Sequence, residues 1–186
     1  MRVSVTLLQY EHGIIRQVID VLGEMVKRNS MKKHQALMNH LVRFLEDYLD
    51  KYHHGKEEKL LFPMAIKRSK DLIPEIARLV SEHADARVNI AKMKAMIATE
   101  SAYSNGSLAM VSKALVDSMV RHIRHEEDVV YPKIEEALSL DDDLKLIKKY
   151  EHFNADFSPD FARLGEEFGV KLQDEVLGPG YFSGIS

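Results

Sequence analysis

The feature that most constrains this chain is an internal repeat built around histidine and glutamate. Residues 53–63 and 122–132 both read His-x-x-x-Glu-Glu-x-aliphatic-aliphatic-aromatic-Pro, and the two copies are offset by 69 residues. Upstream of each copy lies Glu-His-x-x-x-Arg, at residues 11–16 and 82–87, with an offset of 71. The nearly equal offsets indicate a helix pair used twice. Each pair supplies a single histidine on its first helix and His-x-x-x-Glu on its second.

The repeat also selects among neighbouring histidines. One His-x-x-x-Glu motif is weak evidence for a site, but two copies in the same eleven-residue frame rarely arise by accident. His53 has a counterpart in the second copy, whereas the counterpart of His54 is Ile123. We therefore place His54 outside the site, as a supporting or surface residue. Glu58 and Glu127, which follow the repeated glutamates, are expected mainly to face solvent, and a supporting role beside the ligands is the less favoured alternative.

Hydrophobic periodicity predicts an all-α fold. Apolar residues recur with helical spacing over residues 5–28, 32–69, 71–100 and 107–138. The short links between these stretches force neighbouring helices to run antiparallel, so we expect an up-down antiparallel four-helix bundle containing the helix-pair repeat. Pro63 and Pro132 fall late in two of these helices and predict a kink or break.

The C-terminal part of the chain has a different pattern. Residues 141–157 predict a shorter fifth helix, and from residue 158 the Pro and Gly content rises while the helical pattern weakens. We therefore divide the chain into a bundle at residues 1–140 and a C-terminal helix with an extension at residues 141–186. The extension is expected to pack on the bundle or to be partly ordered, and it is a candidate segment for homo-oligomer formation.

Composition excludes several classes of protein. The chain has no cysteine, which excludes disulfides, thiolate metal sites and iron–sulfur clusters. Its net charge of -3 gives no reason to expect a nucleic-acid partner. No apolar run approaches the ~20 residues that a membrane helix needs. Because the first residues lack the pattern of a signal peptide, we expect a cytoplasmic protein.

The repeated histidines and glutamates fall on the apolar faces of the predicted helices, so they are expected to point into the bundle. Burying two carboxylates without a cation costs several kcal/mol each, roughly, and bound metal ions remove that cost. Two imidazole-rich half-sites that share two carboxylates suggest a pair of metal ions, with each glutamate bridging the two ions. Nitrogen and carboxylate ligands without thiolate suit iron, with manganese or zinc as alternatives.

These residues and their spacing resemble the hemerythrin-like (HHE cation-binding) domain family. The resemblance covers roughly residues 7–137, or about 157 if the fifth helix is included. It implies a four-helix bundle that holds two iron ions in a non-haem di-iron centre, with Glu57 and Glu126 as bridges. The metal ligands that it implies are His12, His53, Glu57, His83, His122 and Glu126.

Two positions depart from the oxygen-carrying members of that family. Those members have a second histidine one turn after the first on the third helix, where this chain has Arg87, and an aspartate where it has Glu127. Four His and two Glu resemble instead the branch implicated in repair of nitrosatively damaged iron centres. If each iron takes two imidazoles, two carboxylate oxygens and a bridging oxygen, each keeps one open position. His125, one turn from His122, is expected to lie outside the site, and a supporting role or replacement of the missing third-helix ligand is the less favoured alternative.

Three functions remain open at this point. The first is a di-iron protein that binds or senses O2 or a related small diatomic ligand. The second is a di-iron stress protein that reduces NO or peroxide, or that repairs or delivers iron to damaged centres. The third is a metal-free helical interaction domain. No general base or nucleophile stands apart from the candidate ligands, so whether the protein is an enzyme is left open.

Overall fold

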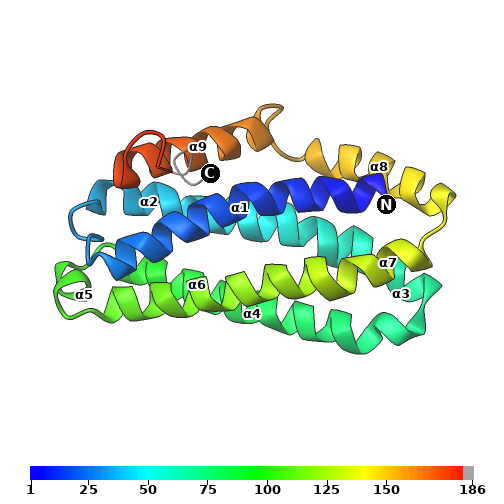
Figure 1. The fold of residues 1–186 in the computed structure, drawn as a ribbon, viewed down its shortest axis with the longest axis horizontal. Coiled ribbons are helices and arrows are strands. Elements are labelled where there is room, and N and C mark those ends of the chain that lie inside the picture. Colours follow the sequence, from blue (N-terminus) through cyan, green and yellow to red (C-terminus); the bar gives the residue numbers. More distant parts are fainter. Residues whose placement is uncertain (182–186) are drawn as a thin grey trace.

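The chain is described over residues 1–181 by a computed structural model, and this part is helical with no β-strand (Figure 1). The segments η1, η2 and η4 are π-helical and η3 is a 3₁₀ turn. In chain order the elements are α1 (Val3–Lys27), α2 (Gln35–Phe44), η1 (Leu45–His54), η2 (Glu57–Leu61), α3 (Phe62–Arg68), η3 (Lys70–Leu72), α4 (Ile73–Met96), α5 (Glu100–Ser104), α6 (Ser107–His125), η4 (Glu126–Val130), α7 (Tyr131–Ala137), α8 (Leu140–Asn154) and α9 (Phe161–Leu177).

Four long rods lie side by side (Figure 1). They are α1, the run from α2 to α3, α4, and the run from α6 to α7. Helix α6 packs against both α1 and α4, and η1 packs against the same two helices. The predicted all-α class is therefore confirmed, and the four rods are consistent with the predicted bundle.

The two late prolines sit where the helix changes type. Pro63 and Pro132 occupy the second position of α3 and α7, directly after the π-helical segments η2 and η4. Proline lacks a backbone N–H, and its ring crowds the carbonyl four residues earlier, so it strains a regular α-helix. The predicted interruption takes the form of a π-helical segment, and each rod continues beyond it.

The core consists of two apolar clusters with polar residues between them. Leu8 on α1 belongs to one cluster and Ile15 to the other, and His12 lies between these two on the same helix. All three side chains are fully buried. The interior of the rods therefore changes from apolar to polar and back to apolar, and the polar layer is closed off from water on both sides.

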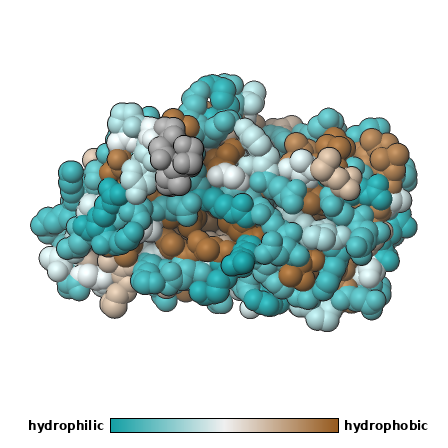
Figure 2. Space-filling model, viewed as in Figure 1, coloured by the Kyte–Doolittle hydropathy of each residue, from teal (hydrophilic) through white to brown (hydrophobic). Residues whose placement is uncertain are grey.

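The surface over this interior is mainly polar. Figure 2 shows one face, on which hydrophilic side chains predominate and apolar patches lie between them. Exposed apolar side chains such as Met110 and Leu140 also occur on the molecule, as on most folded domains. Within residues 1–181, no helix combines the length and the apolar character that crossing a bilayer requires.

Helix α8 corresponds to the fifth helix that the sequence predicts, and it packs on α1. It begins with a capping box, in which Ser139 and Asp142 bond each other's backbone N–H groups. The next residue, Asp143, accepts hydrogen bonds from the backbone N–H groups of Val3 and Ser4 and from the Ser4 hydroxyl. These contacts fix the start of α1 against α8.

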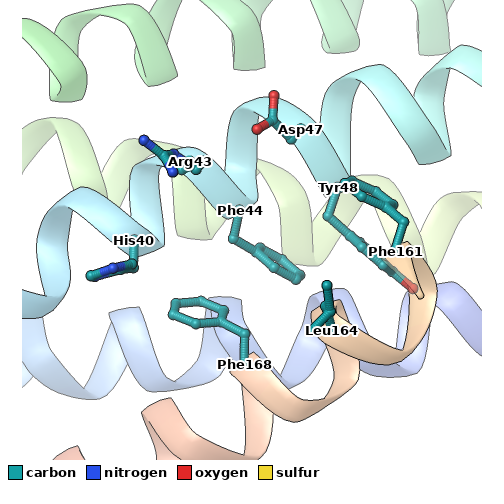
Figure 3. Close-up of a pocket in the computed structure, with 9 residues that line it drawn as sticks. His40, Arg43, Phe44, Asp47, Tyr48, Phe161, Leu164 and Phe168 are labelled. Carbon is teal, nitrogen blue, oxygen red and sulfur yellow. The ribbon is translucent and has the colours of Figure 1, made fainter. Parts of the chain in front are cut away.

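Helix α9 is an element that the sequence pattern did not predict, and it also packs on α1. Its close approach depends on glycine. A Cβ on Gly165 would lie 2.4 Å from the ring of Tyr48, and one on Gly169 would lie 2.7 Å from the amide of Gln17. A groove of about 360 Å³ lies between α9 and the stretch formed by α2 and η1 (Figure 3). Its aromatic lining includes Phe44 and Phe168.

We expect Gly165→Ala to lower the free energy of unfolding by about 1–3 kcal/mol, because the ring of Tyr48 must move. That ring is buried and stacks between Phe44 and Phe161, which leaves it little room. Urea denaturation measures the effect. Gly13→Ala is the matched control, since Gly13 lies in α1 with nothing within 4 Å of its Cβ direction. The control is expected to be neutral or slightly stabilising, and an equal loss in both variants would contradict the packing argument.

Candidate metal centre

The four rods bring the six sequence-predicted residues into one buried layer. None of the six is more than 2% exposed. The ligand candidates are distributed as His12 on α1, His53 on η1, Glu57 on η2, His83 on α4, His122 on α6 and Glu126 on η4.

The buried side chains form two groups with the spacing that a metal ion needs. In each group, ligand atoms from all members lie within 4.8 Å of one another. One group contains His12 and His53 with both glutamates. The other contains His83 and His122 together with His54. Five imidazoles are therefore divided as two and three, rather than four as two and two.

Each glutamate lies against imidazoles of both groups. One carboxylate oxygen of Glu126 is 3.1 Å from Nε2 of His12, and the other is 3.3 Å from Nε2 of His122. Oε2 of Glu57 is 3.7 Å from Nε2 of His53 and 3.5 Å from Nε2 of His83. Carboxylates placed in this way have the position that a bridge between two ions requires.

Each of the four histidines among the six candidate ligands also contacts a carboxylate other than Glu57 and Glu126. This contact is made through Nδ1. With Nδ1 donating its proton to a carboxylate, Nε2 is left as an acceptor that points into the site, which is the tautomer that a metal ligand needs. The pairs are His12 with Glu127 at 2.9 Å, His53 with Glu11 at 3.0 Å, His83 with Glu58 at 2.8 Å and His122 with Glu82 at 2.8 Å.

The same four carboxylates are each paired with a cation. The pairs are Arg16 with Glu127, Lys56 with Glu11, Arg87 with Glu58 and Arg78 with Glu82. Three of these cations are arginines at the protein surface, whereas Lys56 is 2% exposed and lies 3.5 Å above the ring of Tyr52. The expectation that Glu58 and Glu127 mainly face solvent is thus wrong, because their hydrogen bonds to imidazoles hold them partly buried.

Glu11 and Glu82, which contact Nδ1 of His53 and of His122, were not assigned a role from the sequence. Both recur at the 71-residue offset, directly before His12 and His83. That recurrence was the available signal. The partner could not be read from it, because Glu11 bonds His53 on another helix and not the adjacent His12.

Proton affinities in this layer are shifted by burial and by close charges. Burial and the neighbouring Glu126 raise the pKa of Glu57 well above its usual value. Burial acts the same way on Glu126, but contacts with His122 and His12 outweigh it and lower its pKa. Burial opposes protonation of His122, yet Glu126 raises its pKa to about 9. Burial lowers the pKa of His53 to about 4. The pKa values of the two glutamates are thus shifted in opposite directions, and so are those of His53 and His122.

Several atoms in the layer have no hydrogen-bond partner in the described part of the chain. They include Nε2 of His12 and of His53, Oε2 of Glu57 and both carboxylate oxygens of Glu126. Leaving such buried polar atoms unpaired costs about 1–3 kcal/mol each. A divalent cation fits this donor set, because it would satisfy all of these atoms at once and would neutralise the carboxylates.

The other histidines lie apart from the two groups. His125 is partly buried and bonds Glu75 at 3.0 Å. His34 is half-buried, and His40 and His152 are exposed. His54, by contrast, belongs to the second group and is fully buried beside His83, so the surface alternative for it is wrong.

A comparison with protein families finds a match to the model described as the hemerythrin HHE cation binding domain, over residues 3–134. This match covers more than half of the chain and includes all six candidate ligands. No curated protein and no solved structure matches the chain.

Proposed function

Since the chain belongs to the hemerythrin family of HHE cation-binding domains, we propose that it holds two iron ions in its buried layer and binds O2 or a related small diatomic ligand there. The observation that carries this proposal is the adjacency of two donor groups that share Glu57 and Glu126. Nitrogen and oxygen donors without thiolate favour iron over softer metals, with manganese or zinc as alternatives.

The six residues proposed as metal ligands are those that the repeat singles out. His12 and His53 would hold one ion, His83 and His122 the other, and the two glutamates would bridge them. Bound ferrous ions would supply the electrons and the open coordination position that O2 binding requires. The carboxylates at Nδ1 would keep each imidazole oriented and electron-rich.

The chain's other contribution is to exclude water. Apolar clusters close the layer on both sides, and none of the candidate ligands is more than 2% exposed. Tyr131 is fully buried, stacks on His12 with a centroid distance of 5.5 Å, and donates a hydrogen bond to Glu57 at 2.5 Å. A small uncharged diatomic molecule can enter such a dry layer far more easily than a hydrated ion.

A second candidate is a stress protein that reduces NO or peroxide, or that repairs or delivers iron. The observation that favours it is Arg87, which replaces the second third-helix histidine of oxygen carriers and is committed to Glu58 and Asp50, both at 2.7 Å.

One experiment separates these two functions. The protein is loaded with ferrous iron without oxygen, its iron content is measured, and its absorption spectrum is followed through repeated cycles of air and argon. We expect about two irons per chain and a spectral change that reverses over several cycles. A change that does not reverse, with water or N2O formed from peroxide or NO, supports the second candidate. Less than one metal per chain after loading with iron, manganese or zinc would falsify both. The exposed His40, replaced by Ala, is the control.

A further inference from the structure

His54 is a buried imidazole that the internal repeat does not explain. Its counterpart in the second copy is Ile123, yet His54 is fully buried. Neither of its ring nitrogens has a hydrogen-bond partner in the described chain. Its ring stacks on that of His83, with centroids 3.6 Å apart and planes 11° apart. No hydrogen bond within residues 1–181 offsets the cost of burying these two nitrogens.

His53 and His54 are adjacent in sequence, yet both side chains are buried. In an α-helix consecutive side chains point about 100° apart, so adjacent residues seldom share an inward face. Both histidines end the ten-residue π-helical segment η1, whose wider turns bring neighbouring side chains closer in direction. The equivalent stretch of the second copy is α-helical within α6. Ile123, the equivalent residue there, is buried as well, so the position faces inward in both copies and the first copy places an imidazole in it.

Two of the other candidate ligands lie next to His54. A ring nitrogen of His54 lies within 4.8 Å of ligand atoms from both His83 and His122. The two Nε2 atoms of that pair are 3.0 Å apart, about the separation of two nitrogens that bind one ion at right angles from roughly 2.1 Å. Nδ1 of His54 is 3.6 Å from Asp50, a carboxylate that Arg87 holds at 2.7 Å.

We propose that His54 is a third imidazole ligand of the ion held by His83 and His122. This proposal rests on the proposed function. The two ions then differ, although the repeated ligands are matched. If each shared glutamate binds both ions, the His54 ion has five protein ligands and its neighbour has four. A six-coordinate ion at the His54 position keeps one non-protein position, and its neighbour keeps two.

The consequence is that an external ligand has a preferred ion. If four histidines were divided equally, each ion would keep one open position. Small ligands would then have two equivalent binding positions. If His54 binds and one further ligand is shared between the two ions, the His54 ion would have all six of its ligands. The ion held by His12 and His53 would then keep a single open position for an external ligand. Tyr131 lies on this side, stacked on His12. His54 is thus a residue that determines how many external ligands bind.

The test compares the wild-type chain with His54→Ile, which restores the residue that the second copy carries at its equivalent, fully packed position. Both proteins are loaded with iron-57, and the Mössbauer spectra and the rate of iron loss to a ferrous chelator are measured. We expect H54I to keep its helical circular dichroism, to change one of two iron signals, and to lose one iron at least about tenfold faster. His125→Ile, a histidine replacement outside both groups, should change neither readout.

Two further outcomes keep the inference separate from the proposed function. Wild-type protein that binds two irons, with H54I identical to it in both readouts, overturns the role of His54 and leaves the di-iron proposal intact. Wild-type protein that binds no iron overturns both.

A crystal structure of the iron-loaded wild-type protein decides the matter even if H54I does not fold. A nitrogen of His54 about 2.0–2.3 Å from an iron supports the proposal, and a ring that binds no iron refutes it.

Discussion

Replacing Glu126 by Ala is expected to remove at least one of the two irons. Its two carboxylate oxygens lie against imidazoles of different groups, 3.1 Å from His12 and 3.3 Å from His122, so the change removes a donor from both positions. Ala also leaves these imidazoles without the fully buried carboxylate that contacts both. Iron per chain, measured after anaerobic loading and gel filtration, should fall from about two to one or fewer.

The control for this variant is Glu151→Ala, which removes an exposed glutamate on α8. It should keep the iron content of the wild-type chain. Glu57→Ala provides a second comparison, because Glu57 approaches both groups through one oxygen while the other accepts the hydroxyl of Tyr131. If E126A keeps both irons, Glu126 is not a bridge, and the ions lie elsewhere in the layer.

Removing the metal should destabilise the whole fold. The metal-free layer buries two carboxylates and at least five imidazoles, several with unpaired atoms. A ligand present at 1,000 times its dissociation constant stabilises the folded state by about 4 kcal/mol, and 1 kcal/mol shifts the Tm of a domain this size by about 2–4 °C. Calorimetry at neutral pH should therefore show Tm falling by about 10 °C after chelation.

E126A controls for effects of the chelator other than removal of the metal. If that variant has already lost its metal, its Tm should already be low and chelation should lower it little further. A wild-type Tm that does not change on complete removal of iron would mean that the buried groups neutralise one another by sharing protons. The opposed pKa shifts of Glu57 and Glu126 provide a route for that.

The repeat made most of the buried layer predictable. Because the two copies align residue by residue, His53 and Glu57 could be selected over the equally spaced His54 and Glu58 from the sequence alone. The all-α class followed from periodicity in the same way, and the fold confirms it. Ligation of metal by these residues remains a proposal.

What could not be predicted depends on backbone geometry and on contacts between distant residues. The burial of His54 was missed because the lack of a histidine at its counterpart, Ile123, was taken to exclude it from the site, although an apolar counterpart indicates a buried position. The role of Glu11 was missed because its imidazole partner is 42 residues away. Helix α9 was missed because its packing uses Gly165 and Gly169, which weaken a helical pattern when the sequence is considered alone.

The crossed pairs of the layer have a consequence for how the molecule comes apart. His12 in the first copy is oriented by Glu127 in the second, and His83 in the second is oriented by Glu58 in the first. Each copy of the repeat therefore supplies a carboxylate that orients a histidine of the other copy. Cleaving the chain between the two copies, near η3, would leave two fragments, neither of which has a complete set of oriented imidazoles. Any metal ions bound in the layer would therefore be released when the two copies separate.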